Sequence, residues 1–172
     1  MSGLWAKVRA IFFGPEKPKR RTVNARTGEA GESAAAAHLA GIGLKVLARN
    51  WRNPDDTREE LDLVCMDGDV LVFVEVKSRK SGALVGGYQA VNKRKKEVLL
   101  RVCRAYLGRL RPPARHYRFD IVEVAHSALP AAVQRAEAAQ LPEHLCSVRD
   151  GLEVLHFANV PLFPERAIHR HR

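Results

Sequence analysis

Cysteine is scarce in this 172-residue sequence, and long apolar runs are absent from it. Cys65, Cys103 and Cys146 form no CxxC pair and no metal-binding spacing, which indicates free thiols in a reducing cytoplasm rather than a disulfide framework. No apolar stretch approaches the roughly 20 residues of a transmembrane helix. The apolar residues near the N-terminus are interrupted by basic ones and precede no small-residue cleavage pattern, so a secretory signal is not expected.

Acidic residues are also few relative to basic ones. The chain has 19 Asp and Glu against 29 Lys and Arg, which gives a formal net charge of +10. This excess favours a polyanionic partner, with nucleic acid first and an anionic membrane surface second. A basic protein with no nucleic-acid role would have the same composition. Hydrophobic residues make up 46% of the chain, enough for one domain with a core.

The distribution of apolar and charged residues divides the chain into an arm, a domain and a tail. Residues 1–27 combine a short amphipathic stretch with a proline-containing basic run, which predicts either an arm that touches nucleic acid, a membrane or a partner, or a frayed tail without a function. The domain is expected to span 28–161 with an insertion at about 127–147, followed by a flexible tail at 162–172.

Within the domain, runs of helical and alternating character follow one another. The expected elements are a helix at 28–43, strands at 44–51, 60–66 and 70–77, a helix at 91–107, a strand at 118–124, a short helix at 130–140 and a strand at 152–157. The order of helix, three strands, helix and strand predicts an α/β fold with a mixed central sheet.

The most informative feature is a pair of charges at the end of an apolar strand. The run at 70–74 suits a protein core, yet Glu75 and Lys77 follow it. Residues i and i+2 of a strand lie on one face, so these two side chains point together. Charges in such a place are costly without partners, and a metal ion with a phosphate would supply them.

Asp62 joins this pair through the predicted hairpin. The dipeptide at 67–68 is a turn signal, and with this turn Asp62 lies opposite Phe73 and diagonal to Glu75. The two carboxylates are then roughly 7–8 Å apart at the backbone, a separation at which they can share one cation. A three-residue turn would send Asp62 to the other face. A cross-strand ion pair at a solvated strand end is the structural alternative.

Several short segments occur in a distinctive order. They are Gly31-Glu32, Ala48-Arg49-Asn50-Trp51-Arg52, Glu60-Leu61-Asp62-Leu63-Val64, Val72-Phe73-Val74-Glu75-Val76-Lys77, Gln89-Ala90-Val91 with Lys95, Arg118-Phe119-Asp120 and Leu155-His156-Phe157-Ala158-Asn159. In this order they resemble the YraN family of predicted bacterial endonucleases, within the PD-(D/E)XK superfamily. The likeness covers about residues 28–126 and 151–161. Glu59 departs from the family pattern, which usually has glycine there.

The resemblance implies a restriction-endonuclease-like fold with an α-β-β-β-α-β core, close to that of archaeal Holliday-junction resolvases. It implies a metal-dependent endonuclease that hydrolyses phosphodiester bonds of DNA, including branched or structured DNA. The implied catalytic residues are Asp62, Glu75, Lys77 and Glu32, and the implied ligands of Mg²⁺ or Mn²⁺ are Asp62, Glu75 and Glu32. The implied nucleic-acid contacts are Gln89, Lys93, Arg94, Lys95 and Lys96. Resolvases cut two strands symmetrically, which makes a homodimer a candidate assembly.

Some of these residues also have a structural explanation. A carboxylate at Glu32 would stabilise a helix N-terminus, and Gln89 suits the start of a helix. The basic residues at 93–96 suit a solvated helix face, although four in a row favour phosphate contact. The alternative function is a non-catalytic nucleic-acid-binding module that kept the nuclease fold.

Overall fold

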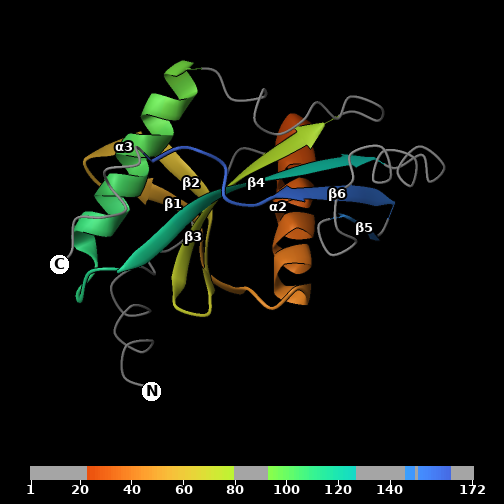
Figure 1. Ribbon diagram of the computed structural model, residues 1–172. Helices are drawn as coiled ribbons and strands as arrows, with labels where there is room; N and C mark the ends of the chain where they lie inside the picture. The colour runs from red at the N-terminus through yellow and green to blue at the C-terminus, as the bar shows by residue number, and fades with distance from the viewer. Residues whose placement is uncertain (1–22, 80–92, 127–145, 150, 164–172) are drawn as a thin grey trace.

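The computed structural model describes residues 23–79, 93–126, 146–149 and 151–163 (Figure 1). Its elements are α2 (Val23–Gly41), β1 (Lys45–Asn53), β2 (Asp56–Asp67), β3 (Val70–Arg79), α3 (Lys93–Arg109), β4 (His116–His126), β5 (Cys146–Arg149) and β6 (Leu152–Phe157). One six-stranded sheet has the order β1-β2-β3-β4-β6-β5. The β3–β4 pair is parallel and the other neighbouring pairs are antiparallel. The predicted α/β fold with a mixed sheet is confirmed, and it is consistent with a restriction-endonuclease-like core.

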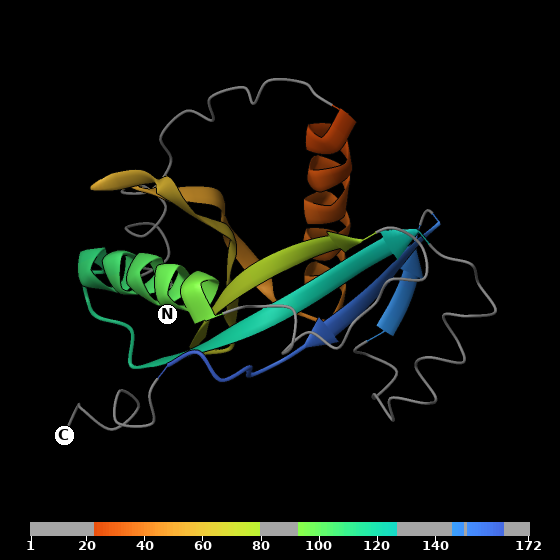
Figure 2. The ribbon, with the colours of Figure 1, turned by 90° about the horizontal axis from the view of Figure 1, so that it is seen from above.

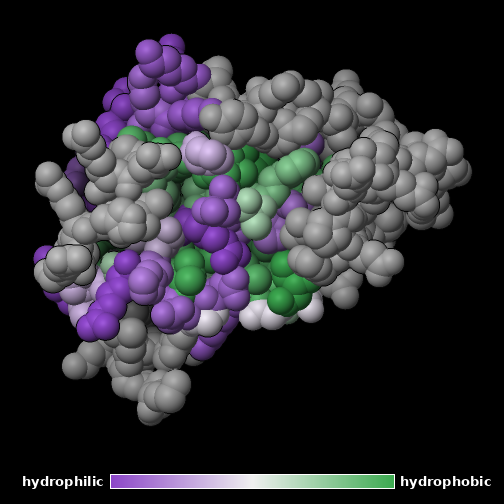
Figure 3. All heavy atoms as spheres, viewed as in Figure 1, coloured by the Kyte–Doolittle hydropathy of each residue, from purple (hydrophilic) through white to green (hydrophobic). Residues whose placement is uncertain are grey.

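The two described helices cover opposite faces of the sheet (Figure 2). The central strand β3 is apolar on both faces because each face packs against one helix. Its Leu71 and Phe73 pack in the cluster that includes α3, and Val72 and Val74 pack in the cluster that includes α2. Hydrophilic side chains gather over the N-terminal end of α3 (Figure 3). Neither described helix has the length and apolar composition needed to cross a bilayer.

The observed elements differ from the predicted ones in most of their boundaries and in one additional strand. The first helix begins at Val23 rather than at residue 28, because a glycine inside a helix costs only about 1 kcal/mol and does not end it. The short strand β5 was not predicted, since four residues give too little alternation to recognise. Leu162 and Phe163, assigned to the tail, pack against the core. The arm through residue 22 and the helix predicted at 130–140 lie outside the described residues.

The β2–β3 turn is offset by one residue from the predicted one. Asp67 pairs with Val70, so the loop consists of Gly68 and Asp69 rather than of residues 67–68. Gly68 has a φ of 57°, and glycine with positive φ at the first loop position is typical of a type II′ turn. The predicted register is therefore wrong.

This turn changes the residue opposite Asp62. The β2–β3 ladder ends with Leu63 opposite Val74, so its next step places Glu75, rather than the predicted Phe73, opposite Asp62. The partner has shifted by two positions, and an even shift preserves the alternation of faces. Asp62 and Glu75 are thus direct rather than diagonal neighbours across the strands.

The neighbouring strand β1 is irregular at the level of Asp62, where Arg49 pairs with Leu63 and Trp51 pairs with Leu61. Asn50 has a φ of 51°, in the left-handed region. Ala48 and Trp51 of β1 both pack in the α3 cluster, as do Val64 and Leu61 of β2, although each pair is an odd number of residues apart. Within this short stretch, the alternation of side chains between the two faces of the sheet therefore shifts by one residue in both β1 and β2.

Candidate functional site

Two lysines converge on one buried carboxylate at the end of β3. Lys77 Nζ lies 2.6 Å from Glu75 Oε1, so these residues share a face as predicted. Lys95 of α3 reaches the same oxygen, with Nζ at 3.1 Å. Glu75 is only 3% exposed, and its other oxygen, Oε2, is buried with no hydrogen-bond partner among the described residues. One oxygen of Glu75 thus binds two cations, and the buried second oxygen makes no hydrogen bond with the described residues.

The Asp62 carboxylate takes the place of a backbone acceptor where β2 and β3 separate. The ladder stops at Leu63, and Asp62 Oδ2 accepts a hydrogen bond from the Val76 N–H at 2.8 Å. Burial raises the pKa of Asp62 to about 7, and the negative charges of Glu75 and Glu32 act in the same direction. A buried carboxyl group with a strongly raised pKa is typical of functional sites.

Glu32 approaches this cluster from the other face of the sheet, because α2 crosses β3 at close range. Gly31 is buried, and a Cβ there would collide with the Ser78 Oγ of β3. The close crossing brings Glu32 near enough to influence the pKa of Asp62. In the Gly31-Glu32 pair the glycine therefore permits the approach, and the glutamate supplies the charge.

Gly31→Ala is expected to lower the free energy of unfolding by about 0–2 kcal/mol, since the new methyl group overpacks the α2–β3 contact at a cost of about 1–3 kcal/mol and the higher helix propensity of Ala offsets about 1 kcal/mol of it. Denaturant unfolding measures this change. Ser78→Ala alone is expected to be nearly neutral, because Ser78 is exposed. The double variant should regain most of the loss, because the Ser78 Cβ would lie at 3.4 Å, an ordinary contact. An equally unstable double variant would contradict this explanation.

The residues predicted to contact nucleic acid differ in their surroundings in the structure. Lys95, predicted as a nucleic-acid contact, turns inward to Glu75. Its position four residues before the buried Leu99 puts both on one helix face, a signal that the sequence contains. Lys93 and Arg94 are exposed and Lys96 is half-buried. Gln89 lies outside the described residues.

Glu59 connects the end of the β1–β2 hairpin to α3. Its Oε1 accepts a hydrogen bond from Arg101 Nε at 2.8 Å, and its Oε2 accepts one from Asn53 Nδ2 at 3.1 Å. Arg109 Nη2 donates to Asp55 Oδ2 at the same hairpin, at 2.8 Å. The helix that carries the second lysine of the site is therefore fixed to β1 and β2. Sequence reasoning gave Glu59 no role.

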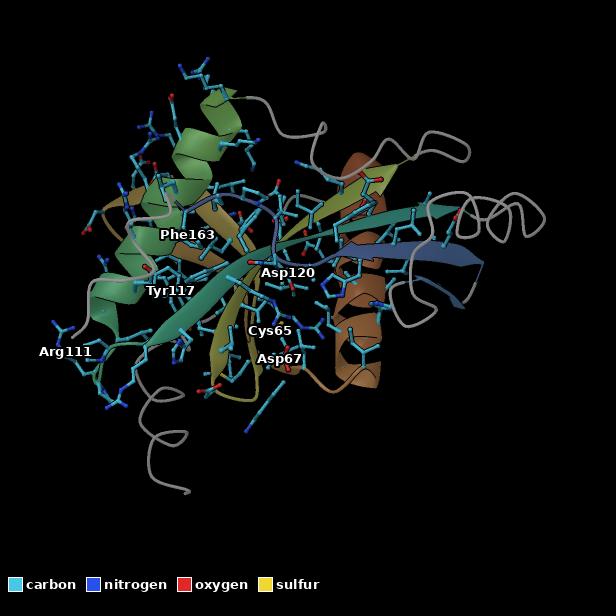
Figure 4. The ribbon with its side chains drawn as sticks, in the orientation of Figure 1. Cys65, Asp67, Arg111, Tyr117, Asp120 and Phe163 are labelled. Atoms are coloured by element: carbon cyan, nitrogen blue, oxygen red, sulfur yellow. The ribbon has the colours of Figure 1, made fainter. Side chains whose placement is uncertain are left out.

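A second buried polar cluster surrounds Asp120 of β4, which is 0% exposed. Its carboxylate lies 2.9 Å from His156 Nε2, and it accepts hydrogen bonds from Arg118 Nε at 3.0 Å and from the Asn159 N–H at 2.8 Å. Arg118 also donates to Asp67, at 2.7 Å. Figure 4 shows Asp120 near the middle of the sheet, with Asp67 at the lower end of the β2–β3 hairpin.

These contacts reverse the effect of burial on the pKa of Asp120. Burial alone raises the pKa of this carboxyl group, but the hydrogen bonds from His156, Arg118 and the Asn159 N–H outweigh burial, so its pKa lies below the ordinary value. The cluster ties the chain after β6 back to β4. The sequence predicted the strands at 118–124 and 152–157 from local sequence patterns, but it singled out Asp120, His156 and Asn159 only through the family resemblance.

In the described part of the chain, no group of three or more His, Cys, Asp or Glu side chains is arranged to hold a metal ion. The donor set nevertheless suits a hard cation, because Asp62 and Glu75 offer carboxylate oxygens and no described residue hydrogen-bonds to the buried Glu75 Oε2. Protein-bound Mg²⁺ keeps several waters and commonly uses one or two carboxylates with substrate phosphate. These residues fit Mg²⁺ or Mn²⁺ as a partial ligand set.

Comparison with known proteins identifies the family. The model of "Uncharacterised protein family UPF0102" matches residues 31–124, which include every described residue of the site. A UPF0102 protein of Nitratidesulfovibrio vulgaris is 38% identical over 129 residues, covering 75% of this chain and 87% of that protein. One from Beutenbergia cavernae is 42% identical over 121 residues (70% and 93%), and one from Symbiobacterium thermophilum is 44% identical over 99 residues (58% and 81%). These names state no activity. The chain belongs to the UPF0102 family, which is the YraN family.

Proposed function

We propose that this protein is a metal-dependent endonuclease that hydrolyses phosphodiester bonds of DNA. The observation that carries the proposal is the environment of Glu75, which binds two lysines through one carboxylate oxygen, while its other oxygen is buried and has no hydrogen-bond partner in the part of the chain that the structure describes. Buried polar atoms are normally hydrogen-bonded, and an exception calls for a functional explanation such as a missing ion.

The chain's own residues have distinct roles in this proposal. A divalent cation at Asp62 and Glu75, when bound, would supply Lewis-acid activation and neutralise charge on the scissile phosphate. Lys77 and Lys95 hold two ammonium groups beside Glu75, from which they can donate to phosphate oxygens as negative charge develops. Glu32 adds a third carboxylate within electrostatic range of Asp62.

The net charge of +10 supports DNA as the substrate. The likeness of the YraN family to Holliday-junction resolvases supports branched or structured DNA as the finer assignment. A homodimer acting on two strands, a cytoplasmic location, and an arm at 1–27 that touches a membrane or a partner belong to the same proposal. Sedimentation of the DNA complex tests the dimer.

The test of the activity is cleavage of a supercoiled plasmid and of a four-way junction in Mg²⁺, Mn²⁺ or EDTA. We expect cleavage with either cation, none with EDTA, and a rate lower by about tenfold or more for Glu75→Gln. Glu29→Gln is the matched control, since it makes the same change at an exposed position of α2. Cleavage by Glu75→Gln at the wild-type rate would show a contaminating nuclease and refute the proposal.

A non-catalytic nucleic-acid-binding module is the second candidate. It is favoured by one observation, the lack of a complete three-ligand group among the described side chains. This candidate predicts salt-sensitive DNA binding and no cleavage with any divalent cation. The same plasmid assay therefore separates the two functions.

A further inference from the structure

We propose that one duplex arm of the DNA lies along the outer side of α3, leading away from the candidate site. The inference rests on the proposed function, because it takes the scissile phosphate to lie beside Glu75. The surface consists of exposed side chains on α3 and just beyond its end, which we call the basic face. Its members are Lys93, Arg94, Arg101, Arg104 and Arg115.

The charge of α3 is almost entirely of one sign. Its sequence KRKKEVLLRVCRAYLGR contains seven Lys and Arg and one Glu. The buried stripe of Leu99, Val102, Cys103 and Tyr106 faces the sheet, so the other side of the helix faces solvent. Lys93, Arg101 and Arg104 recur on that other side at spacings of eight and three residues, and the exposed Glu97 is the one acidic residue among them. Figure 3 shows the hydrophilic side chains gathered at the N-terminal end of this helix.

Among the residues that the structure describes, most of the basic face lacks the acidic partners that Lys95 and Arg109 of α3 have. Lys95 is bound to Glu75, and Arg109 is bound to Asp55. Within the described residues, by contrast, no salt bridge involves Lys93, Arg94, Arg104 or Arg115. Arg101 binds Glu59 but stays 58% exposed. A row of exposed cations with few acidic partners is complementary to a row of phosphates.

The position of the basic face fixes where such a duplex would run. The N-terminal end of α3 is at the site, because Lys95 reaches Glu75 from its first turn. A helix of 17 residues is about 25 Å long. That length matches about seven base pairs of B-DNA at about 3.4 Å each. The arm would therefore start at the scissile phosphate and follow α3 for about seven base pairs toward Arg115.

The test measures the salt dependence of duplex binding in EDTA by fluorescence anisotropy. Arg104→Gln is expected to reduce the slope of log K against log salt by about 1, and Arg104→Gln/Arg115→Gln by about 2. Arg49→Gln is the matched control: Arg49 is exposed on β1 next to Ala48, which points toward α3, so Arg49 points away from α3. It should leave the slope unchanged. Arg101 is not substituted because it holds the buried Glu59.

Duplex length supplies a second readout. A duplex of about 16 base pairs can occupy both the site and the far end of α3, whereas a DNA hairpin with a stem of about 4 base pairs cannot. The double variant should therefore bind the long duplex more weakly than the wild type does, and bind the short duplex equally well. A variant effect that is the same at both lengths would overturn the inference.

The outcomes separate this inference from the proposed function. Wild-type slopes in both Arg104 variants, together with Mg²⁺-dependent cleavage by the wild-type protein, would overturn the duplex path and keep the nuclease. Reduced slopes without cleavage by any variant or by the wild type would refute the nuclease and keep the DNA-binding surface. Preference of the basic face for single strands or for anionic vesicles over the long duplex would also overturn the inference.

Discussion

Asp62→Asn is expected to slow metal-dependent DNA cleavage by about 10²- to 10³-fold while making the metal-free protein more stable. The amide oxygen can still accept the hydrogen bond from the Val76 N–H, so the geometry of the separating strands is kept. The substitution therefore removes a charge rather than a contact. A change that damages activity and improves stability is the signature of a site maintained for function.

The gain in stability follows from the electrostatics of the site. Burial raises the pKa of Asp62 from 3.8 to about 7, with Glu75 and Glu32 acting in the same direction. A group whose pKa is raised in the folded state contributes stability below its unfolded pKa and loses it as the pH rises through the folded pKa. Asn does not titrate. The extra stability of Asp62→Asn should thus be near zero at about pH 4 and reach about 1–2 kcal/mol above pH 7.

Urea unfolding between about pH 4 and pH 8 in EDTA measures this difference. Asp69→Asn makes the same chemical change at an exposed turn residue and should show no comparable pH dependence. Added Mg²⁺ should stabilise the wild-type protein but not Asp62→Asn, because a ligand that binds the folded state raises its stability. If Asp62→Asn were less stable than the wild type at pH 8, the Asp62 carboxylate would be structural.

The parts of the site that follow from backbone geometry were predictable from the sequence. Glu75 and Lys77 share a face because side chains alternate with a period of two, and their ion pair confirms this. The approach of Asp62 to Glu75 was predicted through a wrong register. An Asp-Gly dipeptide signals a type I′ turn, which needs a positive φ at both residues. Asp67 is not among the described residues with a positive φ and pairs with Val70, so the loop consists of Gly68 and Asp69.

Contacts between distant segments were not predictable from local patterns. Gly31 meets Ser78, and Glu59 meets Arg101, only because of how each helix is seated on the sheet. Lys95 shows the intermediate case. Its helical phase relative to the buried stripe indicates an inward side chain, yet only the packing of α3 shows that it ends at Glu75.

Asp120→Ala is expected to lower the free energy of unfolding by about 3–5 kcal/mol, the largest effect on stability that we expect from a single substitution here. The change removes the acceptor for His156, for Arg118 and for the Asn159 N–H in a place without solvent access. A buried donor that loses its acceptor retains the full cost of its desolvation.

Asp67→Ala is the matched control, because it removes the other carboxylate that binds Arg118. Asp67 is 46% exposed, so water can replace the lost contact and the expected change is about 0–1 kcal/mol. Thermal or urea unfolding of the two variants compares them directly. Similar losses for Asp120→Ala and Asp67→Ala would mean that the Arg118 ion pairs alone, and not the buried acceptor site, stabilise this part of the sheet.

The same cluster predicts acid sensitivity. The pKa of Asp120 lies below its ordinary value of 3.8, since the hydrogen bonds from His156, Arg118 and the Asn159 N–H outweigh its burial. A carboxyl group with a lowered pKa contributes stability above its unfolded pKa and loses it as the pH falls through the folded pKa. The stability difference between the wild type and Asp120→Asn should therefore be constant above about pH 5 and shrink below about pH 4. A difference that stays constant through this acid range would assign the effect to packing rather than to the charge of Asp120.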